Sequence, residues 1–204
     1  TAEIVEYSEA ALNAVSRIPG HYTIKVDPLS DKHLLSKHGF YYCDTLIVPC
    51  CTAQKLVRIE HPDATISKQT EWEELLPICH GAFVHGRYHR DFNLEKTGAD
   101  LRYDNWLQQF HLKDAVYGLY WSNELVGFIA HDANKLVLHA LAESQRGRGR
   151  AKYWWSAVGS NLLTMGHEDV TSSISASNLS ALNLYSSLGF SFCQSMDVYH
   201  RLIE

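Results

Sequence analysis

The sequence of 204 residues has no long apolar run and no broad excess of positive charge. No stretch approaches the ~18 consecutive apolar residues of a membrane-spanning helix, so no membrane association is expected. The formal net charge of −5 argues against general nucleic-acid binding, because that needs a wide basic surface to neutralise phosphates. The N-terminus has no basic leader followed by an apolar core, and we therefore expect a soluble cytoplasmic protein.

Cysteine and histidine also lack a pattern that would indicate a metal or a disulfide framework. The cysteines number five and include one adjacent pair but no CxxC motif: Cys43, Cys50, Cys51, Cys79 and Cys193. This odd count suits a reducing compartment better than a set of disulfides or a zinc site. The 12 histidines are scattered, and no metal site is expected from them.

The first fifty residues alternate between strand-like and helix-like segments. The pattern predicts strands at 3–7, 21–26 and 41–51 and helices at 8–18 and 30–38, with Ser8 as a helix N-cap. Such a β-α-β-α-β unit is small for an independent core, so it should pack against the rest of the chain. We define residues 1–52 as a small α/β N-terminal region and residues 53–204 as the main domain.

In the main domain, the sequence predicts two helices, three strands, and then alternating helices and strands. Thr70 is expected to cap the first helix, and turn sequences join the three central strands into an antiparallel meander. The expected helices cover residues 70–84, 100–111, 152–165 and 179–188. The expected strands cover residues 115–121, 124–131, 136–142, 170–176 and 190–202, with one more within 56–66.

The segment Gln145-Arg146-Gly147-Arg148-Gly149-Arg150-Ala151 lies where an apolar strand should turn into a helix. Glycine lets the backbone approach a ligand closely, and the first amides of a helix have no partners of their own. Such a turn binds anions, and phosphate is the usual one. The alternative is a glycine-softened helix start with solvated arginines.

A second motif, Asn178-x-x-Ala181-x-x-Leu184-Tyr185-x-x-x-Gly189-Phe190, lies about thirty residues further on, also at a strand-to-helix junction. Taken alone, Asn178 is an ordinary N-cap and Tyr185 an ordinary half-buried aromatic. Together with Arg146-x-x-Gly149-x-Ala151, however, this motif resembles the acyl-CoA-binding motifs of the GNAT family of N-acetyltransferases.

The resemblance implies a GNAT fold of the α/β class, with flanking helices and a mixed, mostly antiparallel sheet whose central strand pair splays apart. It also implies acetyl-CoA as co-substrate. The pantetheine arm would pair with the strand edge formed by Leu141, Ala142 and Glu143, and Asn178 and Tyr185 would contact it as well. The pyrophosphate would lie on the loop residues, namely Arg146, Gly147, Arg148, Gly149, Arg150 and Ala151.

Acyl transfer to an amine needs a neutral amine, a donor for the oxyanion and a proton for the leaving thiolate. By resemblance, Tyr185 is the general acid, and a phenol with a pKa of about 10 is protonated at neutral pH. The general base is not identified, and the candidates are His139 and Glu143. His85 and His89 are further histidines in the right titration range. Direct attack needs no covalent intermediate, so the cysteines have no assigned role, and an acetyl-cysteine route is the minority interpretation.

The acceptor must be inferred from less generic residues. Residues 86–91, together with 103–106, resemble the dTDP-fucosamine (dTDP-4-amino-4,6-dideoxygalactose) acetyltransferases of surface-polysaccharide synthesis, a GNAT subgroup that also carries a small α/β N-terminal region. The resemblance suggests five substrate-binding residues: Arg87, Tyr88, His89, Asp91 and Trp106. The plainer interpretation is that they form a lid over the cofactor.

These observations predict an acetyl-CoA-dependent N-acetyltransferase that acts on a small molecule, preferably a nucleotide amino sugar. A GNAT enzyme acting on a protein N-terminus, a polyamine or an amino acid is one alternative. A non-catalytic acyl-CoA-binding protein is another. The sequence leaves a homodimer open.

Overall fold

The computed structural model describes residues 1–204. Its helices are α1 (Glu9–Val15), α2 (His33–Lys37), α3 (Trp72–Cys79), α4 (Lys96–His111), α5 (Ala151–Thr164) and α6 (Leu179–Ser187). Its strands are β1 (Ala2–Ile4), β2 (Gly20–Val26), β3 (Tyr41–Thr52), β4 (Ala64–Ser67), β5 (Val116–Trp121), β6 (Glu124–Asp132), β7 (Lys135–Leu141), β8 (Asp169–Ser172), β9 (Ile174–Ser175) and β10 (Ser191–Ile203). None of the six helices combines the length and the apolar composition that a membrane-spanning segment requires.

The ten strands form one mixed sheet in the order β1-β2-β10-β3-β8-β7-β6-β5-β4, and β9 pairs with β3. Only β1 with β2 and β7 with β8 are parallel. The β7/β8 pair meets only at Lys135 with Thr171 and at Leu136 with Ser172, whereas β7 stays paired with β6 as far as Leu141. One edge of β7 is therefore unpaired beyond Leu136, and the expected α/β fold with a splayed central strand pair is confirmed.

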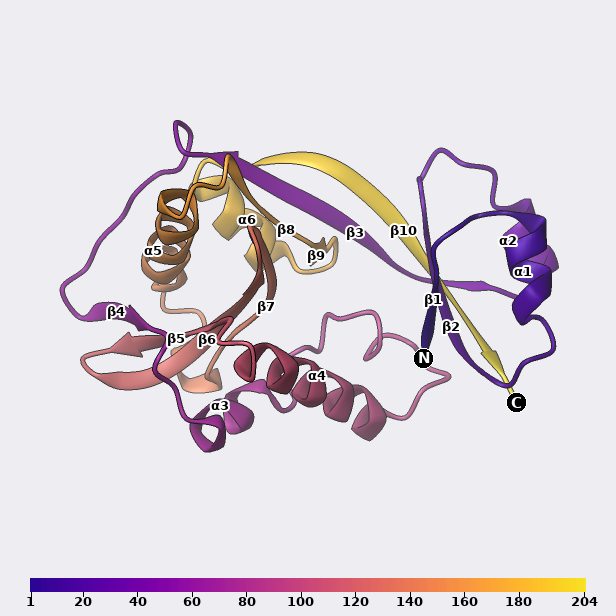
Figure 1. The fold of residues 1–204 in the computed structure, drawn as a ribbon, viewed down its shortest axis with the longest axis horizontal. Coiled ribbons are helices and arrows are strands. Elements are labelled where there is room, and N and C mark those ends of the chain that lie inside the picture. The colour runs from indigo at the N-terminus through magenta and orange to yellow at the C-terminus, as the bar shows by residue number, and fades with distance from the viewer.

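The helices cover the two faces of the main domain in separate groups (Figure 1). Strand β6 alternates between them, as expected for side chains on a pleated strand. Phe128 belongs to the apolar cluster under α3 and α4, whereas Ile129 belongs to the cluster under α5 and α6. A third, smaller cluster includes Leu12 and Leu35 and lies in the N-terminal region.

Two long strands join the N-terminal region and the main domain. Strand β3 extends from the N-terminal region into the main domain, and β10 extends from the main domain into the N-terminal region. Figure 1 shows β3 and β10 running together from one region into the other. Their pairing is symmetric: Tyr41 lies opposite His200 in the same way as Ser191 lies opposite Cys50. The series β1-α1-β2-α2-β3 also repeats the order of β7-α5-β8-α6-β10, with a parallel first pair in each. As a result, β3 belongs to the N-terminal region by sequence but lies beside β8 and β9 of the main domain.

Several element boundaries differ from those expected. Thr70 does not cap α3: its hydroxyl is buried without a partner, and Glu71 takes the cap position without a side-chain hydrogen bond. That helix also ends at Cys79 rather than near residue 84, shortly before Gly81, which has a φ of +72°. Helix α4 begins four residues earlier than expected, and the strand expected at 170–176 is split into β8 and β9.

Two capping predictions are confirmed. The Ser8 side chain accepts a hydrogen bond from the amide of Ala11 at 3.2 Å, and the Asn178 side chain accepts one from Ala181 at 3.1 Å. Both caps are local interactions within one turn, which is why the sequence could predict them.

Candidate functional site

The arginine-glycine loop connects β7 to α5 through a short 3₁₀ turn, Glu143–Gln145. Gly147 and Gly149 have φ values of +72° and +68°, a conformation that side-chain-bearing residues rarely adopt. No atom lies within 4 Å of where a Cβ would stand on either glycine, so this face of the loop is open. The amides from Gly147 to Ala151 donate to no backbone carbonyl. The loop thus presents free donors at a helix N-terminus, the arrangement that binds anions.

The three arginines of this loop have different roles. Arg146 Nε donates to the Leu141 carbonyl at 2.9 Å, and Arg150 donates to the Gln145 side chain at 3.0 Å. The Arg150 guanidinium also lies 3.8 Å from the centre of the Trp121 ring. These two arginines therefore hold the loop in shape, whereas Arg148 is exposed and has no salt-bridge partner within the protein.

The strand end before the loop stays hydrogen-bonded to β6. Ala142 donates its amide to the Val126 carbonyl at 2.8 Å, the last contact that holds this strand end to β6. Glu143 is exposed and lines a cavity of about 440 Å³ with Arg146 and residues at the end of α3. This cavity does not include His139, so the structure separates the two residues that the sequence offered as bases.

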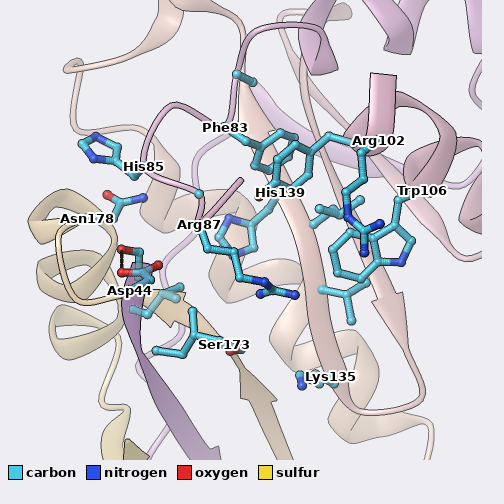
Figure 2. Close-up of a pocket in the computed structure, with 18 of the residues that line it drawn as sticks. Asp44, Phe83, His85, Arg87, Arg102, Trp106, Lys135, His139, Ser173 and Asn178 are labelled. Atoms are coloured by element: carbon cyan, nitrogen blue, oxygen red, sulfur yellow. Dashed lines mark hydrogen bonds between the residues drawn. The ribbon is translucent and has the colours of Figure 1, made fainter. Parts of the chain in front are cut away.

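A larger cavity of about 460 Å³ opens where β7 splays away from β8 (Figure 2). It is bounded by β3, β7, the segment after β8, α4 and the segment after α3. The lining residues that carry charge or another polar group are Glu3, Lys25, Asp44, His85, Arg87, Arg102, Tyr103, Trp106, Lys135, His139, Ser173, Ser175 and Asn178. The cavity therefore combines residues from both regions of the chain.

His139 and Tyr185 form a pair at the wall of this cavity. The Tyr185 hydroxyl lies 3.1 Å from His139 Nε2, at hydrogen-bonding distance. His139 lines the cavity, whereas Tyr185 lies behind it and is fully buried. Burial raises the pKa of Tyr185 to about 12 and lowers that of His139 to about 4. At neutral pH the tyrosine is thus protonated and the histidine neutral.

Four cationic side chains line this cavity. Lys25 pairs with Glu3 at 2.7 Å, but Arg87, Arg102 and Lys135 have no carboxylate partner. The guanidinium groups of Arg87 and Arg102 lie 4.9 and 4.2 Å from the centre of the Tyr88 ring. The aromatic ring thus holds both arginines in place while leaving their charge available to a ligand.

Three of the five residues expected to bind substrate do not line this cavity. Arg87 and Trp106 do, but Tyr88 is buried and stacks on His200 with 5.4 Å between ring centroids. His89 Nε2 donates to Asp100 at 2.7 Å. Asp91 is 2% exposed and faces the N-terminal region. These residues support the segment that carries Arg87 and do not face the cavity themselves.

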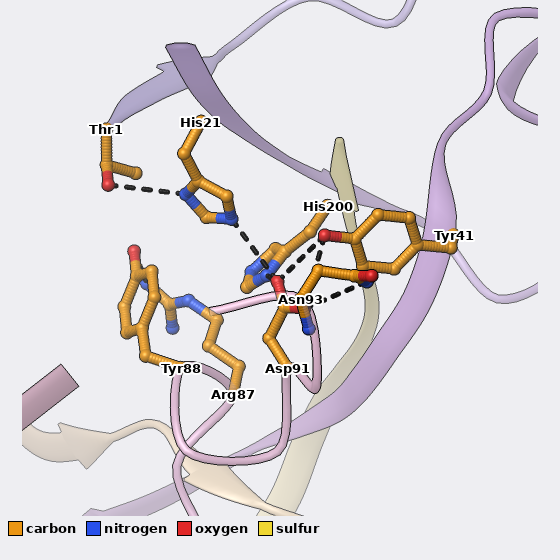
Figure 3. A network of polar contacts seen from close by, with 8 residues as sticks. All are labelled: Thr1, His21, Tyr41, Arg87, Tyr88, Asp91, Asn93 and His200. Atoms are coloured by element: carbon orange, nitrogen blue, oxygen red, sulfur yellow. Dashed lines mark hydrogen bonds and ion pairs between the residues drawn. The ribbon is translucent and has the colours of Figure 1, made fainter. Parts of the chain in front are cut away.

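Asp91 is the centre of a buried polar network between the main domain and the N-terminal region (Figure 3). It accepts hydrogen bonds from His200 Nδ1 at 2.7 Å, the Tyr41 hydroxyl at 3.0 Å and the Asn93 amide at 3.0 Å, while His21 Nε2 lies 3.4 Å away. Burial opposes ionisation of Asp91, but these donors outweigh it and hold its pKa below the ordinary value. Burial lowers the pKa of His200 to about 4. The network therefore consists of a carboxylate and neutral histidines at physiological pH.

Sequence reasoning missed Asp44, which lies on β3 and lines the larger cavity. It is only 1% exposed, although an aspartate is seldom fully buried without a partner. The sequence feature that could have indicated Asp44 is its position as an acidic residue among the β-forming residues of a predicted strand. Its position in the cavity results from β3 crossing into the main domain, which no local pattern predicts.

Comparison with known proteins identifies the domain. The acetyltransferase (GNAT) domain profile matches residues 88–202, which is more than half of the chain. No curated protein matches.

Solved structures resemble this fold at low sequence identity. A GCN5-related N-acetyltransferase from Sphaerobacter thermophilus has a TM-score of 0.65 at 14% identity, over 92% of this chain and 61% of its own. A tandem GNAT protein from the clavulanic acid biosynthesis pathway has a TM-score of 0.58 at 12% identity, covering 95% of this chain and 68% of its own. A fungal GCN5-related glucosamine N-acetyltransferase region within a multi-domain β-N-acetylglucosaminidase has a TM-score of 0.65 at 12% identity, over 94% of this chain and 27% of its own. This chain therefore spans less than two thirds of the Sphaerobacter structure.

Proposed function

Because the chain belongs to the GNAT family of acetyltransferases, we propose that it transfers an acetyl group from acetyl-CoA to the primary amine of a nucleotide-linked amino sugar by direct attack. Acetyl-CoA is the co-substrate of this domain family. The acceptor is a dTDP-4-amino-6-deoxyhexose type of molecule, as the subgroup resemblance of residues 86–91 and 103–106 suggests.

The cofactor site follows from the open loop and the unpaired strand edge. The free amides from Gly147 to Ala151 bind the pyrophosphate, and the exposed Arg148 adds a positive charge near it. The pantetheine arm extends β7 beyond its paired region, along Leu141 and Ala142. It then reaches Asn178, whose Oδ1 caps α6 and whose amide nitrogen is left for the ligand.

Tyr185 supplies the proton that the leaving thiolate takes up. Its raised pKa keeps it protonated, and its hydroxyl meets the cavity wall at His139. The developing thiolate replaces His139 as the hydrogen-bond partner of the hydroxyl, since a charged acceptor binds a donor more strongly than a neutral one. Tyr185 is therefore the general acid and His139 the group that orients it.

The observation that carries the acceptor proposal is the group of three cations without carboxylate partners in the larger cavity. Arg87, Arg102 and Lys135 favour an acceptor with several negative charges, such as a nucleoside diphosphate, and oppose a polyamine. Trp106 offers a flat apolar surface for a base or sugar. A cavity of about 460 Å³ is also within the size range of small-molecule sites. The fungal glucosamine N-acetyltransferase region provides an example of this fold acting on an amino sugar.

A panel of acceptors with acetyl-CoA tests the proposal, with release of the CoA thiol as the measurement. We expect dTDP-4-amino-4,6-dideoxygalactose to be acetylated with a higher kcat/KM than spermine, an N-terminal peptide or a free amino acid. Arg102→Gln combined with Lys135→Gln should raise the KM for the sugar nucleotide about 100-fold or more, since each lost charge-assisted hydrogen bond costs roughly 1.5–3 kcal/mol when a site is desolvated. The matched control is Lys113→Gln, an exposed lysine after α4.

Two outcomes would overturn the proposal. Acetylation of spermine or peptides alone would exclude the nucleotide-sugar acceptor. An unchanged melting temperature in the presence of acetyl-CoA would exclude the cofactor site, since a ligand that binds only the folded state must stabilise it.

A further inference from the structure

We infer that Asp44 of β3 binds the ammonium group of the acceptor and takes up its proton before attack. This inference rests on the proposed acetyltransferase function, but it holds for any primary-amine acceptor of the site. It also gives the N-terminal region a direct part in the chemistry, because β3 is the strand by which that region enters the main domain.

The two oxygens of the Asp44 carboxylate have unequal surroundings. Oδ1 accepts three hydrogen bonds, from Arg90 Nη1 at 2.6 Å, the Ser175 hydroxyl at 2.8 Å and the Thr45 amide at 2.9 Å. Oδ2 is buried and has no hydrogen-bond partner. The carboxylate is thus held in one orientation by one oxygen, while the other lacks a donor.

A buried carboxylate oxygen without a donor is energetically unfavourable, by roughly 1–3 kcal/mol or more for a charged group. Burial raises the pKa of Asp44 above the ordinary value. The donors from Ser175, Arg90 and Thr45, together with the charge of Arg87, only partly offset it. A bound ammonium would supply the missing donor to Oδ2, in addition to the positive charge that Arg90 already provides at Oδ1. A carboxylate with a raised pKa is also a better proton acceptor than an exposed one.

The position of Asp44 in the cavity agrees with this role. Figure 2 shows Asp44 near Asn178 on one side of the cavity, Arg102 and Trp106 on the other, and His139 between them. Asp44 is tied to the segment before Asn178 through Ser175. An acceptor can therefore place its amine at Asp44, next to the expected end of the pantetheine arm, and its anionic part near Arg102.

The other groups considered for the base are engaged, distant or exposed to solvent. His139 lies against the Tyr185 hydroxyl and has a pKa of about 4, too low to take a proton from an ammonium efficiently. Glu143 lines the other cavity. His89 is bonded to Asp100. His85 does line the larger cavity, but it is exposed.

The proton balance is complete with Asp44 and Tyr185. One proton moves from the acceptor ammonium to Asp44, and the neutral amine forms a C–N bond to the thioester carbon. As the C–S bond breaks, the thiolate takes the Tyr185 proton, and Tyr185 recovers one from the amide nitrogen. Asp44 then releases its proton to solvent, so the products are the amide, CoA thiol and one proton.

The symmetry of the two crossing strands sharpens the inference. The position on β10 that corresponds to Asp44 on β3 is Gln194, which is exposed and carries no charge. Only the strand that borders the larger cavity has the acid at this position. A purely structural requirement of the strand pair would apply to both.

The experiment compares Asp44→Asn with wild type on whichever amine of the acceptor panel the wild type acetylates fastest. We expect kcat/KM for the amine to fall about 100-fold or more, the usual effect of losing a general base. The stabilisation by acetyl-CoA in a thermal melt should be unchanged. Asp197→Asn is the matched control, because Asp197 lies on β10 opposite Thr45 and outside the cavity, and it should keep wild-type kinetics.

The pH profile separates a base from a merely structural residue. In wild type, kcat/KM should decrease at low pH through one group that titrates above the ordinary range of an aspartate, and Asp44→Asn should lack this limb. If the variant does not fold, the wild-type pH profile still tests the inference, because a kcat/KM that does not decrease at low pH would overturn it. An activity within about threefold of wild type in Asp44→Asn would overturn the inference. In contrast, failure of the sugar nucleotide as acceptor, with Asp44→Asn still inactive on another amine, would overturn only the acceptor class.

Discussion

Replacing Asp91 with alanine should both destabilise the protein and loosen the segment that carries Arg87. The carboxylate accepts hydrogen bonds from His200, Tyr41 and the Asn93 amide. His200 is 0% exposed, so its Nδ1–H would lose its only acceptor without gaining water, whereas Tyr41 is half-buried and can be partly solvated.

The magnitude follows from these contacts. A hydrogen bond to a charged group contributes roughly 1.5–3 kcal/mol, and an ordinary one about 1 kcal/mol. The loss of the bonds from His200 and Tyr41 therefore predicts a decrease of about 3 kcal/mol in the free energy of unfolding. This value allows for the desolvation cost of the Asp91 charge, which the variant no longer has to meet. For a chain of this length, each 1 kcal/mol shifts the melting temperature by roughly 2–4 °C, so we expect a decrease of about 6–12 °C.

Two measurements check this prediction. Thermal melts give the global loss, and limited digestion with trypsin reports locally, because Arg87 and Arg90 lie in the segment that Asp91 anchors and should be cleaved faster in the variant. Glu95→Ala is the matched control, since Glu95 is exposed on the same segment and its side chain caps nothing. A loss below about 1 kcal/mol with unchanged cleavage would refute the view that this network holds the segment in place.

Two further predictions concern Tyr185 and acid stability. Tyr185→Phe should lower kcat by about 100-fold while leaving acetyl-CoA binding intact, as judged by steady-state kinetics and thermal melts; an unchanged kcat would remove Tyr185 as the general acid. Burial lowers the pKa of His139 and of His200 to about 4 in the folded protein, compared with about 6.5 in the unfolded chain. The contribution of each neutral histidine to the free energy of unfolding is therefore complete above pH 6.5 and is lost as the pH falls toward 4. Urea unfolding at pH 5 should therefore show roughly 2 kcal/mol less stability per histidine than at pH 7.5, and equal stability at the two pH values would contradict their neutral, buried state.

Local sequence patterns predicted the features that depend on a few neighbouring residues. The caps at Ser8 and Asn178 form within one helical turn. The positive φ angles of Gly147 and Gly149 likewise follow from the residue type. Both motifs that resemble the CoA-binding motifs of the GNAT family lie at the strand-to-helix junctions where they were expected. The most misjudged boundary is the end of α3, which stops at Cys79 instead of residue 84, two residues before the positive φ of Gly81.

The substrate side of the site could not be predicted in the same way. Asp91 is close in sequence to Arg87 and Tyr88, and proximity suggested a shared role, but it faces His200 on β10 instead. Asp44 accepts a hydrogen bond from Ser175, far away along the chain. Such contacts are set by which strands pair and in which register, and no short pattern encodes them.

The sequence by itself indicated the cofactor, because two short motifs, each made of neighbouring residues, resemble the acyl-CoA-binding motifs of the GNAT family. Only the tertiary structure decided which side chains line the larger cavity. β3 crosses from the N-terminal region into the main domain, and this crossing brings Asp44 into the same cavity as Arg102 and His139. The physical reason is that a phosphate site is built from consecutive backbone groups, whereas an acceptor site is built from side chains that come together only when the whole sheet has formed.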